Sequence, residues 1–117
     1  MGKLSTHILD TYHGTPAGGV SVELWILGGQ EDMQLKTLIT NTDGRTDGLL
    51  LDAEEMAPGR YELVFHIGDY FRDRGVSNGN PGFLDIIPIR FGIDDVTQGY
   101  HVPLLVSPWS YSTYRGS

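Results

Sequence analysis

Hydrophobic and polar residues alternate along much of this chain with a period of two, which is typical of β-strands that have one buried face. The pattern is clearest over residues 20–27, where valine, leucine or isoleucine occupies every second position. Similar patterns predict strands over 4–12, 35–40, 61–67, 85–93, 100–106 and 110–114. Because proline cannot donate to a strand ladder, Pro88 and Pro103 predict edge positions or bulges.

Turn and helix signals separate these segments. Residues 14–19 form a predicted turn, and residues 28–29 open a longer loop that makes a hairpin of the strands on either side. The segment Asn41-Thr42-Asp43-Gly44-Arg45 predicts a turn with Arg45 at its tip, because Asn and Asp side chains bond their own backbone and Gly permits positive φ. Residues 68–75 predict one short helix, and residues 53–56 a single helical turn.

Sixteen glycines and six prolines fit a chain of short elements joined by tight turns. Seven or eight such strands predict an all-β sandwich or barrel, and the lack of crossover helices disfavours a parallel sheet. The length of 117 residues fits a single domain over residues 1–117.

Charge and cysteine content exclude several classes of function. Fifteen acidic and eight basic side chains give a net charge of −7, which repels nucleic acid and anionic membrane surfaces. No cysteine is present, so a disulfide framework, a thiolate metal site and a cysteine nucleophile are all excluded. The first residues lack the apolar run of a secretory signal, and we therefore expect a cytoplasmic protein.

Candidate chemistry is sparse when each residue is considered alone. The four histidines His7, His13, His66 and His101 do not have the spacing of a zinc motif, and no nucleophile elbow or carboxylate pair stands out. A lone histidine in a small domain is most often a scaffold residue. Residues 109–117 combine aromatics, hydroxyls and an arginine, so we expect an ordered or functional C-terminal segment.

Four separated motifs, in the same order, resemble the transthyretin-like 5-hydroxyisourate hydrolases of purine catabolism. They are Leu4-Ser5-Thr6-His7-Ile8-Leu9-Asp10 with Gly14-Thr15-Pro16-Ala17, Thr42-Asp43-Gly44-Arg45, Tyr100-His101-Val102-Pro103-Leu104-Leu105 and Tyr114-Arg115-Gly116-Ser117. The last tetrapeptide resembles the mark that separates these hydrolases from the hormone carrier transthyretin. The resemblance implies a two-sheet sandwich of eight strands with one short helix, and a homotetramer with sites at subunit interfaces.

The resemblance also implies the site and its chemistry. Its catalytic residues would be His7, Arg45, His101 and Ser117, and its substrate-binding residues His7, Arg45, Tyr114 and Arg115. His7 or His101 would be the base for attack of water on a ring carbonyl, and Arg45 would stabilise the developing negative charge. No metal and no cofactor are expected.

Two features qualify this assignment. Gly99 occupies a position where many relatives carry a further histidine, so it receives no role, and His13 and His66 fall outside the motifs and keep a scaffold role. The alternative function is a small-molecule carrier on the same fold. Such a carrier needs an apolar channel, so the joint presence of His7, Arg45 and His101 favours the hydrolase.

Overall fold

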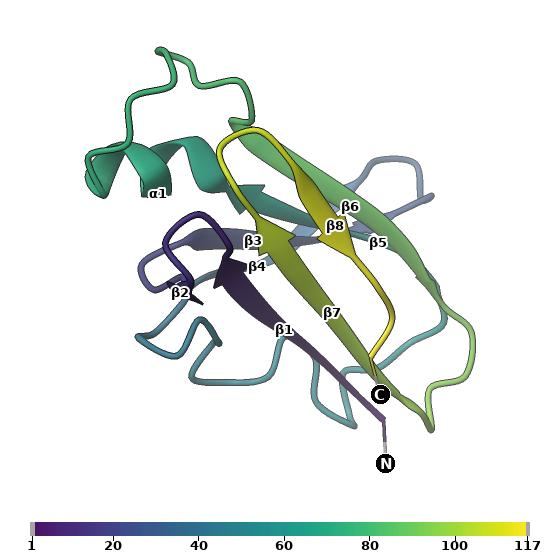
Figure 1. Cartoon of the computed structure of the whole chain (residues 1–117). Helices are drawn as coiled ribbons and strands as arrows, with labels where there is room; N and C mark the ends of the chain where they lie inside the picture. The colour runs from purple at the N-terminus through teal and green to yellow at the C-terminus, as the bar shows by residue number, and fades with distance from the viewer. Residues whose placement is uncertain (1, 117) are drawn as a thin grey trace.

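The computed structural model describes residues 2–116, which fold into two four-stranded sheets packed face to face (Figure 1). This arrangement confirms the predicted all-β sandwich with one short helix. In chain order the elements are β1 (Lys3–Asp10), β2 (Thr15–Pro16), β3 (Ser21–Leu27), β4 (Met33–Ile39), β5 (Gly59–His66), α1 (Ile67–Asp73), β6 (Ile86–Ile93), β7 (Gly99–Val106) and β8 (Tyr111–Thr113).

The two sheets have the strand orders β2-β1-β7-β8 and β4-β3-β5-β6. Every pair is antiparallel except β1 and β7, which run parallel over the whole of both strands. These two strands come from opposite ends of the sequence, and Figure 1 shows the purple β1 beside the green-yellow β7. The first sheet is therefore mixed, and it joins motifs that are far apart in the sequence.

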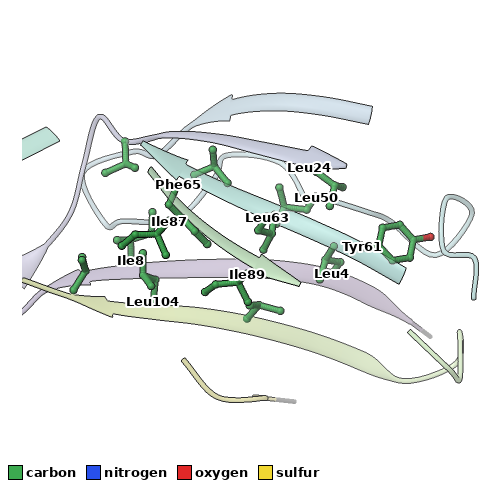
Figure 2. Packing of buried hydrophobic residues seen from close by; sticks show 14 of the residues in the cluster. Leu4, Ile8, Leu24, Leu50, Tyr61, Leu63, Phe65, Ile87, Ile89 and Leu104 are labelled. Atoms are coloured by element: carbon green, nitrogen blue, oxygen red, sulfur yellow. The ribbon is translucent and has the colours of Figure 1, made fainter. Parts of the chain in front are cut away.

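The hydrophobic core fills the space between the sheets (Figure 2). Leu4 and Ile8 of β1 and Leu63 and Phe65 of β5 are completely buried there. Full burial of one such side chain contributes roughly 1.5–3 kcal/mol. Because the even positions of β1 face this core, its odd positions face outward, and this alternation presents Ser5 and His7 on the outer surface of the sheet.

Several local predictions are confirmed with small changes. β3 and β4 form the predicted hairpin, and α1 lies within a residue or two of the predicted helix. The predicted strand over 4–12 ends at Asp10, whose carbonyl accepts a turn hydrogen bond from the Gly14 N–H at 2.9 Å. The predicted turn over 14–19 includes the two-residue strand β2, which pairs with β1. Residues 52–56 form the expected single turn, closed by Met56 N–H to the Asp52 carbonyl at 3.1 Å.

The two strand prolines behave differently. Pro88 lies on β6, an edge strand, as predicted. Pro103 lies on β7, an interior strand without a bulge in its recorded pairing, so the prediction of an edge position or bulge is wrong there. The physical reason is a gap in the neighbouring ladder. β8 stops pairing at Thr113, and the chain rejoins β7 only at Gly116, so Pro103 faces the position where no donor is required.

The helix α1 packs one side on the sandwich, with Ile67, Tyr70 and Phe71 buried. Among residues 2–116 no helix is both long and apolar enough to cross a membrane.

Candidate active site

Three successive residues of β1 make three different connections. Thr6 faces inward, and its buried hydroxyl donates to the Val102 carbonyl of β7 at 2.7 Å. Ser5 and His7 face outward and are half-buried. The backbone pairing of β1 with β7 over eight residues sets the register of the outward side chains, and the inward bond of Thr6 adds one more link between the two strands.

That register brings His101 to the same surface. Ser5 of β1 lies directly opposite His101 of β7, and the Ser5 Oγ is 2.9 Å from the His101 Nδ1. His7 lies opposite Pro103, two positions further along the same pair of strands. The two predicted histidines thus share one face of the sheet because β1 and β7 run parallel.

The turn over residues 41–45 covers His7. The Asn41 Oδ1 accepts the backbone N–H groups of Asp43 at 2.9 Å and Arg45 at 3.2 Å, which confirms the predicted side-chain bonded turn. Arg45 does not lie at its tip as predicted, because its carbonyl accepts the Asn41 N–H at 2.7 Å and so closes the turn. The His7 Nε2 lies 2.8 Å from the Asp43 carbonyl oxygen. Since a carbonyl can only accept, the His7 Nε2 carries the proton and its Nδ1 is free to accept one.

Gly44 makes this docking possible. Its φ of 76° lies in the left-handed region, and its carbonyl accepts the Ile8 N–H at 2.8 Å. A Cβ atom at this position would lie 2.4 Å from the Ile8 carbonyl oxygen and 3.3 Å from the His7 Cδ2. Only glycine therefore lets the turn approach β1 closely enough to reach His7.

The electrostatic surroundings of His101 favour its neutral form. Burial lowers the pKa of the imidazole below 6.5, and the positive charges of Arg45 and Lys3, with that of His7 whenever its ring is protonated, lower it further. The Arg45 guanidinium is exposed and makes no hydrogen bond to the described residues. The lowered pKa suits His101 to act as a general base near pH 7, and the charge of the Arg45 guanidinium, which bonds no described group, contributes to that shift.

The C-terminal segment reaches His101 through its backbone. Gly116 and His101 form an antiparallel bridge, and the chain between Thr113 and Gly116 keeps the register of β8. Tyr114 is level with Pro103 in this register, and its side chain is 61% exposed. Ser117, the remaining predicted catalytic residue, lies outside the described residues.

The side chain of Arg115 contacts Gln98 and Tyr100 and neither of the two site histidines. Its guanidinium donates to the Gln98 Oε1 at 2.8 Å and stacks 4.3 Å above the centre of the Tyr100 ring. Both contacts place it beside a cavity of about 550 Å³ lined mainly by β6, β7 and the C-terminal segment. The described structure thus places His7 and His101 on one sheet face and Arg45 in the turn that contacts His7, whereas the Arg115 guanidinium contacts Gln98 and Tyr100.

His13 and His66 have carboxylate partners of their own. The His13 Nδ1 lies 2.6 Å from the Oδ2 of the buried Asp10. His66 of β5 pairs with Glu23 of β3, and both residues belong to the sheet that does not carry His7 and His101. These contacts are in keeping with the scaffold role predicted for both. Among residues 2–116, no three His, Asp or Glu side chains are grouped so that they could hold a metal ion.

Sequence reasoning gave no role to Ser5 or Gly116, although both contact His101. The alternation of side chains along β1 could have indicated Ser5, because it lies two residues before His7 and therefore on the same face of the strand. The contact of Gly116 depends on the antiparallel return of the chain, for which no local signal exists.

The chain is thus a two-sheet β-sandwich with an imidazole pair on the outer face of one sheet and an arginine in the adjoining turn. A model of the HIUase/Transthyretin family matches residues 4–116, and the chain belongs to this family. It is 53% identical to "5-hydroxyisourate hydrolase 2" of Rhizobium meliloti, over 99% of this chain and 97% of that protein.

Solved structures agree with this assignment. The Klebsiella pneumoniae 5-hydroxyisourate hydrolase superposes with a TM-score of 0.82 at 38% identity, and the match covers all of both chains. An (S)-allantoin synthase superposes with a TM-score of 0.94 at 46% identity. The match covers 99% of this chain and 44% of that one, so this chain spans less than half of the longer protein.

Proposed function

We propose that this chain hydrolyses 5-hydroxyisourate to 2-oxo-4-hydroxy-4-carboxy-5-ureidoimidazoline, a step in the breakdown of urate. The carrying observation is the placement of two imidazoles on a single sheet face, with Arg45 in the turn that contacts His7 and close enough for its charge to act on His101. The names of the R. meliloti and K. pneumoniae relatives support the substrate. A carrier would have no use for a neutral base beside a cation.

The reaction begins with attack of water on the carbonyl carbon of a cyclic amide. The Nε2 of His101 takes one proton of the water as the new C–O bond forms, and an oxyanion develops on the carbonyl oxygen. The ring C–N bond then breaks, and the leaving nitrogen takes the proton from the imidazolium. The former carbonyl carbon becomes a carboxylic acid that releases its proton to solvent to give the carboxylate of the product, so the oxygen and both protons of the water are accounted for.

The other residues of the proposed site stabilise the negative charge of the oxyanion and orient the water and the substrate. Arg45 presents a planar fork of donors to the oxyanion, which favours the transition state over the planar substrate. His7, held by the Asp43 carbonyl, offers its Nδ1 as an acceptor for the water or a ring N–H. Within the same proposal, Tyr114 and Arg115 bind substrate, Arg115 from its place beside Gln98 and Tyr100, and Ser117 is a catalytic residue. Deletion of residues 114–117 tests these roles.

The same proposal includes a homotetramer in which this face meets another subunit. Two observations support it. The edge strands β6 and β8 have an unpaired side, and the exposed rings of Tyr12 and Trp109 lie 5.9 Å apart at one end of the sheet. Light scattering on purified protein measures the oligomer. The expected cytoplasmic location is tested by cell fractionation.

The deciding experiment compares freshly generated 5-hydroxyisourate with and without the protein, since the compound also decays spontaneously. We expect faster ring opening, unchanged by a chelator, and a loss of about 10²–10⁴ in kcat for His101→Asn. His66→Asn is the matched control, because His66 and its partner Glu23 both lie in the sheet that does not carry the candidate site. A rate equal to spontaneous decay would refute the hydrolase, and activity lost to a chelator and restored by zinc would refute the cofactor-free mechanism.

A further inference from the structure

The half-buried hydroxyl of Ser5 is the only described side-chain group that hydrogen-bonds the imidazole of His101, and the proposed mechanism leaves it without a task. The distance from the Ser5 Oγ to the His101 Nδ1 is 2.9 Å. We propose that Ser5 is a positioning residue that accepts the Nδ1 proton of His101 and so keeps the Nε2 unprotonated for catalysis. The inference deepens the proposed hydrolase function and rests on it.

The tautomer of a neutral imidazole decides which nitrogen can act as a base. When one ring nitrogen donates a hydrogen bond, the other is the acceptor, and the partner of the first nitrogen fixes the choice. A neutral imidazole without partners favours the form protonated at Nε2. That form would leave His101 with its only basic nitrogen turned toward β1 and Ser5, where no water can be activated.

An acceptor at Nδ1 also serves the next state of the reaction. Once the Nε2 has taken a proton from water, both ring nitrogens carry hydrogen, and the Ser5 oxygen still accepts from the Nδ1. Ser5 therefore favours the reactive tautomer and the imidazolium with a single geometry. The hydroxyl hydrogen of Ser5 is left to donate to another partner.

The backbone fixes Ser5 independently of its own hydroxyl. Ser5 is paired with His101 in the parallel ladder, and the neighbouring Thr6 ties β1 to the Val102 carbonyl from the inner side. Along the edge of β7 that faces β8, Gly116 holds the backbone of His101 through two hydrogen bonds. The imidazole is thus confined by strands on both sides, and Ser5 acts on it through a defined approach.

The test combines Ser5→Ala with Ser5→Thr and uses Thr6→Val as a matched control on the same strand. Ser5→Ala removes the acceptor, Ser5→Thr restores a hydroxyl on a residue suited to strands, and Thr6→Val removes only the inward hydroxyl. The readouts are the ¹⁵N chemical shifts of the His101 ring, which report the tautomer without substrate, and the kinetics of 5-hydroxyisourate hydrolysis.

We expect the wild-type ring and the Ser5→Thr ring to be protonated at Nδ1, and the Ser5→Ala ring to shift toward the Nε2-protonated form. The kcat of Ser5→Ala should fall about three- to tenfold, as expected for one lost hydrogen bond, with KM nearly unchanged. Thr6→Val should keep the wild-type tautomer.

Three results would overturn the role of Ser5: an Nε2-protonated ring in the wild type, an unchanged tautomer in Ser5→Ala, or a shifted tautomer with unchanged kcat. Absence of hydrolysis by the wild type would refute the proposed function instead, and the ¹⁵N spectra would still decide the contact at Nδ1.

Discussion

Gly116 and His101 exchange two backbone hydrogen bonds, with N···O distances of 3.2 Å from the His101 N–H and 2.7 Å from the Gly116 N–H. A Cβ atom at position 116 would lie 3.0 Å from the His101 Cδ2 and 3.1 Å from its Cβ. The C-terminal segment therefore packs its bare backbone against the imidazole. The absence of a side chain at Gly116 is a feature of the site.

The first prediction concerns Gly116→Ala. The added methyl group should push the imidazole by a few tenths of an ångström, and kcat should fall by about tenfold because general-base transfer depends on position. The midpoint of thermal unfolding should hardly change, since alanine is tolerated in an extended backbone. Steady-state kinetics and a thermal melt measure the two effects.

Gly92→Ala is the control for that variant. It places a methyl group on strand β6, where the nearest atom is the Gly59 carbonyl oxygen at 4.0 Å. Equal kinetics for the two variants would show that the close approach of Gly116 has no catalytic consequence.

A second prediction separates the charge of Arg45 from its shape. Arg45→Ala should lower kcat by about 10²–10³, the usual effect of removing an oxyanion donor. Arg45→Lys keeps the charge but loses the planar fork, so its kcat should lie between those of the wild type and Arg45→Ala. Stability should be unchanged, because the guanidinium forms no hydrogen bond to residues 2–116. Wild-type kcat in Arg45→Ala would remove Arg45 from the mechanism.

The third prediction is a pH dependence. Burial, together with the charges of Arg45, His7 and Lys3, lowers the pKa of His101 below 6.5. The base is active when neutral, so kcat/KM should rise with pH through this lowered pKa and stay level near pH 7, and kcat should follow where bound substrate leaves the pKa unchanged. The unfolded chain binds this proton more readily, so the same shift makes the free energy of unfolding decrease as the pH falls below about 6.5.

Lys3→Met tests the electrostatic part of that shift. Removal of one positive charge should raise the pKa of His101, and the acidic limb of kcat should move to higher pH. A proton NMR titration of the ring measures this directly. Lys36→Met is the control, because Lys36 pairs with Glu55 at 2.9 Å. An equal shift in both variants would indicate a general effect of net charge.

The sequence was sufficient for local structure where one pattern dominates. The alternation in β3 and the Asn41 turn were predicted correctly because their causes lie within a few consecutive residues. The parallel pairing of β1 with β7 has no such cause, since it joins the two ends of the chain. Pro103 was misplaced for the same reason: the gap in the β8 ladder depends on a distant strand.

The same division applies to the site. The resemblance named His7, Arg45 and His101; the structure places the two histidines on one sheet face and Arg45 in the turn that contacts His7, and their roles stay a prediction. It could not indicate that Ser5 contacts the His101 ring, because that contact depends on side-chain direction and register. Nor could it indicate that Arg115, named as a substrate-binding residue, bonds Gln98 and lies over the Tyr100 ring in the described chain.

The last prediction concerns Asp10, a carboxylate that is 1% exposed and lies outside the proposed mechanism. It accepts the His13 backbone N–H at 2.9 Å, the His13 Nδ1–H at 2.6 Å and the Tyr70 hydroxyl at 2.7 Å. Burial alone would raise the pKa of Asp10, but these donors outweigh it and hold the pKa below 3.8. Burial and the same carboxylate raise the pKa of Tyr70 to about 12.

Asp10→Asn should therefore lower the free energy of unfolding at pH 7 by about 2–3 kcal/mol, because one amide cannot accept all three donors and the charge is lost. The deficit should shrink as the pH falls through the lowered pKa of Asp10, where the wild-type carboxyl becomes neutral too. Urea unfolding at several pH values measures both effects. His13→Asn should also lose stability yet keep kcat within a few-fold. An Asp10→Asn protein as stable as the wild type at pH 7, or a well-folded His13→Asn protein without turnover, would contradict the assignment of this network to the scaffold.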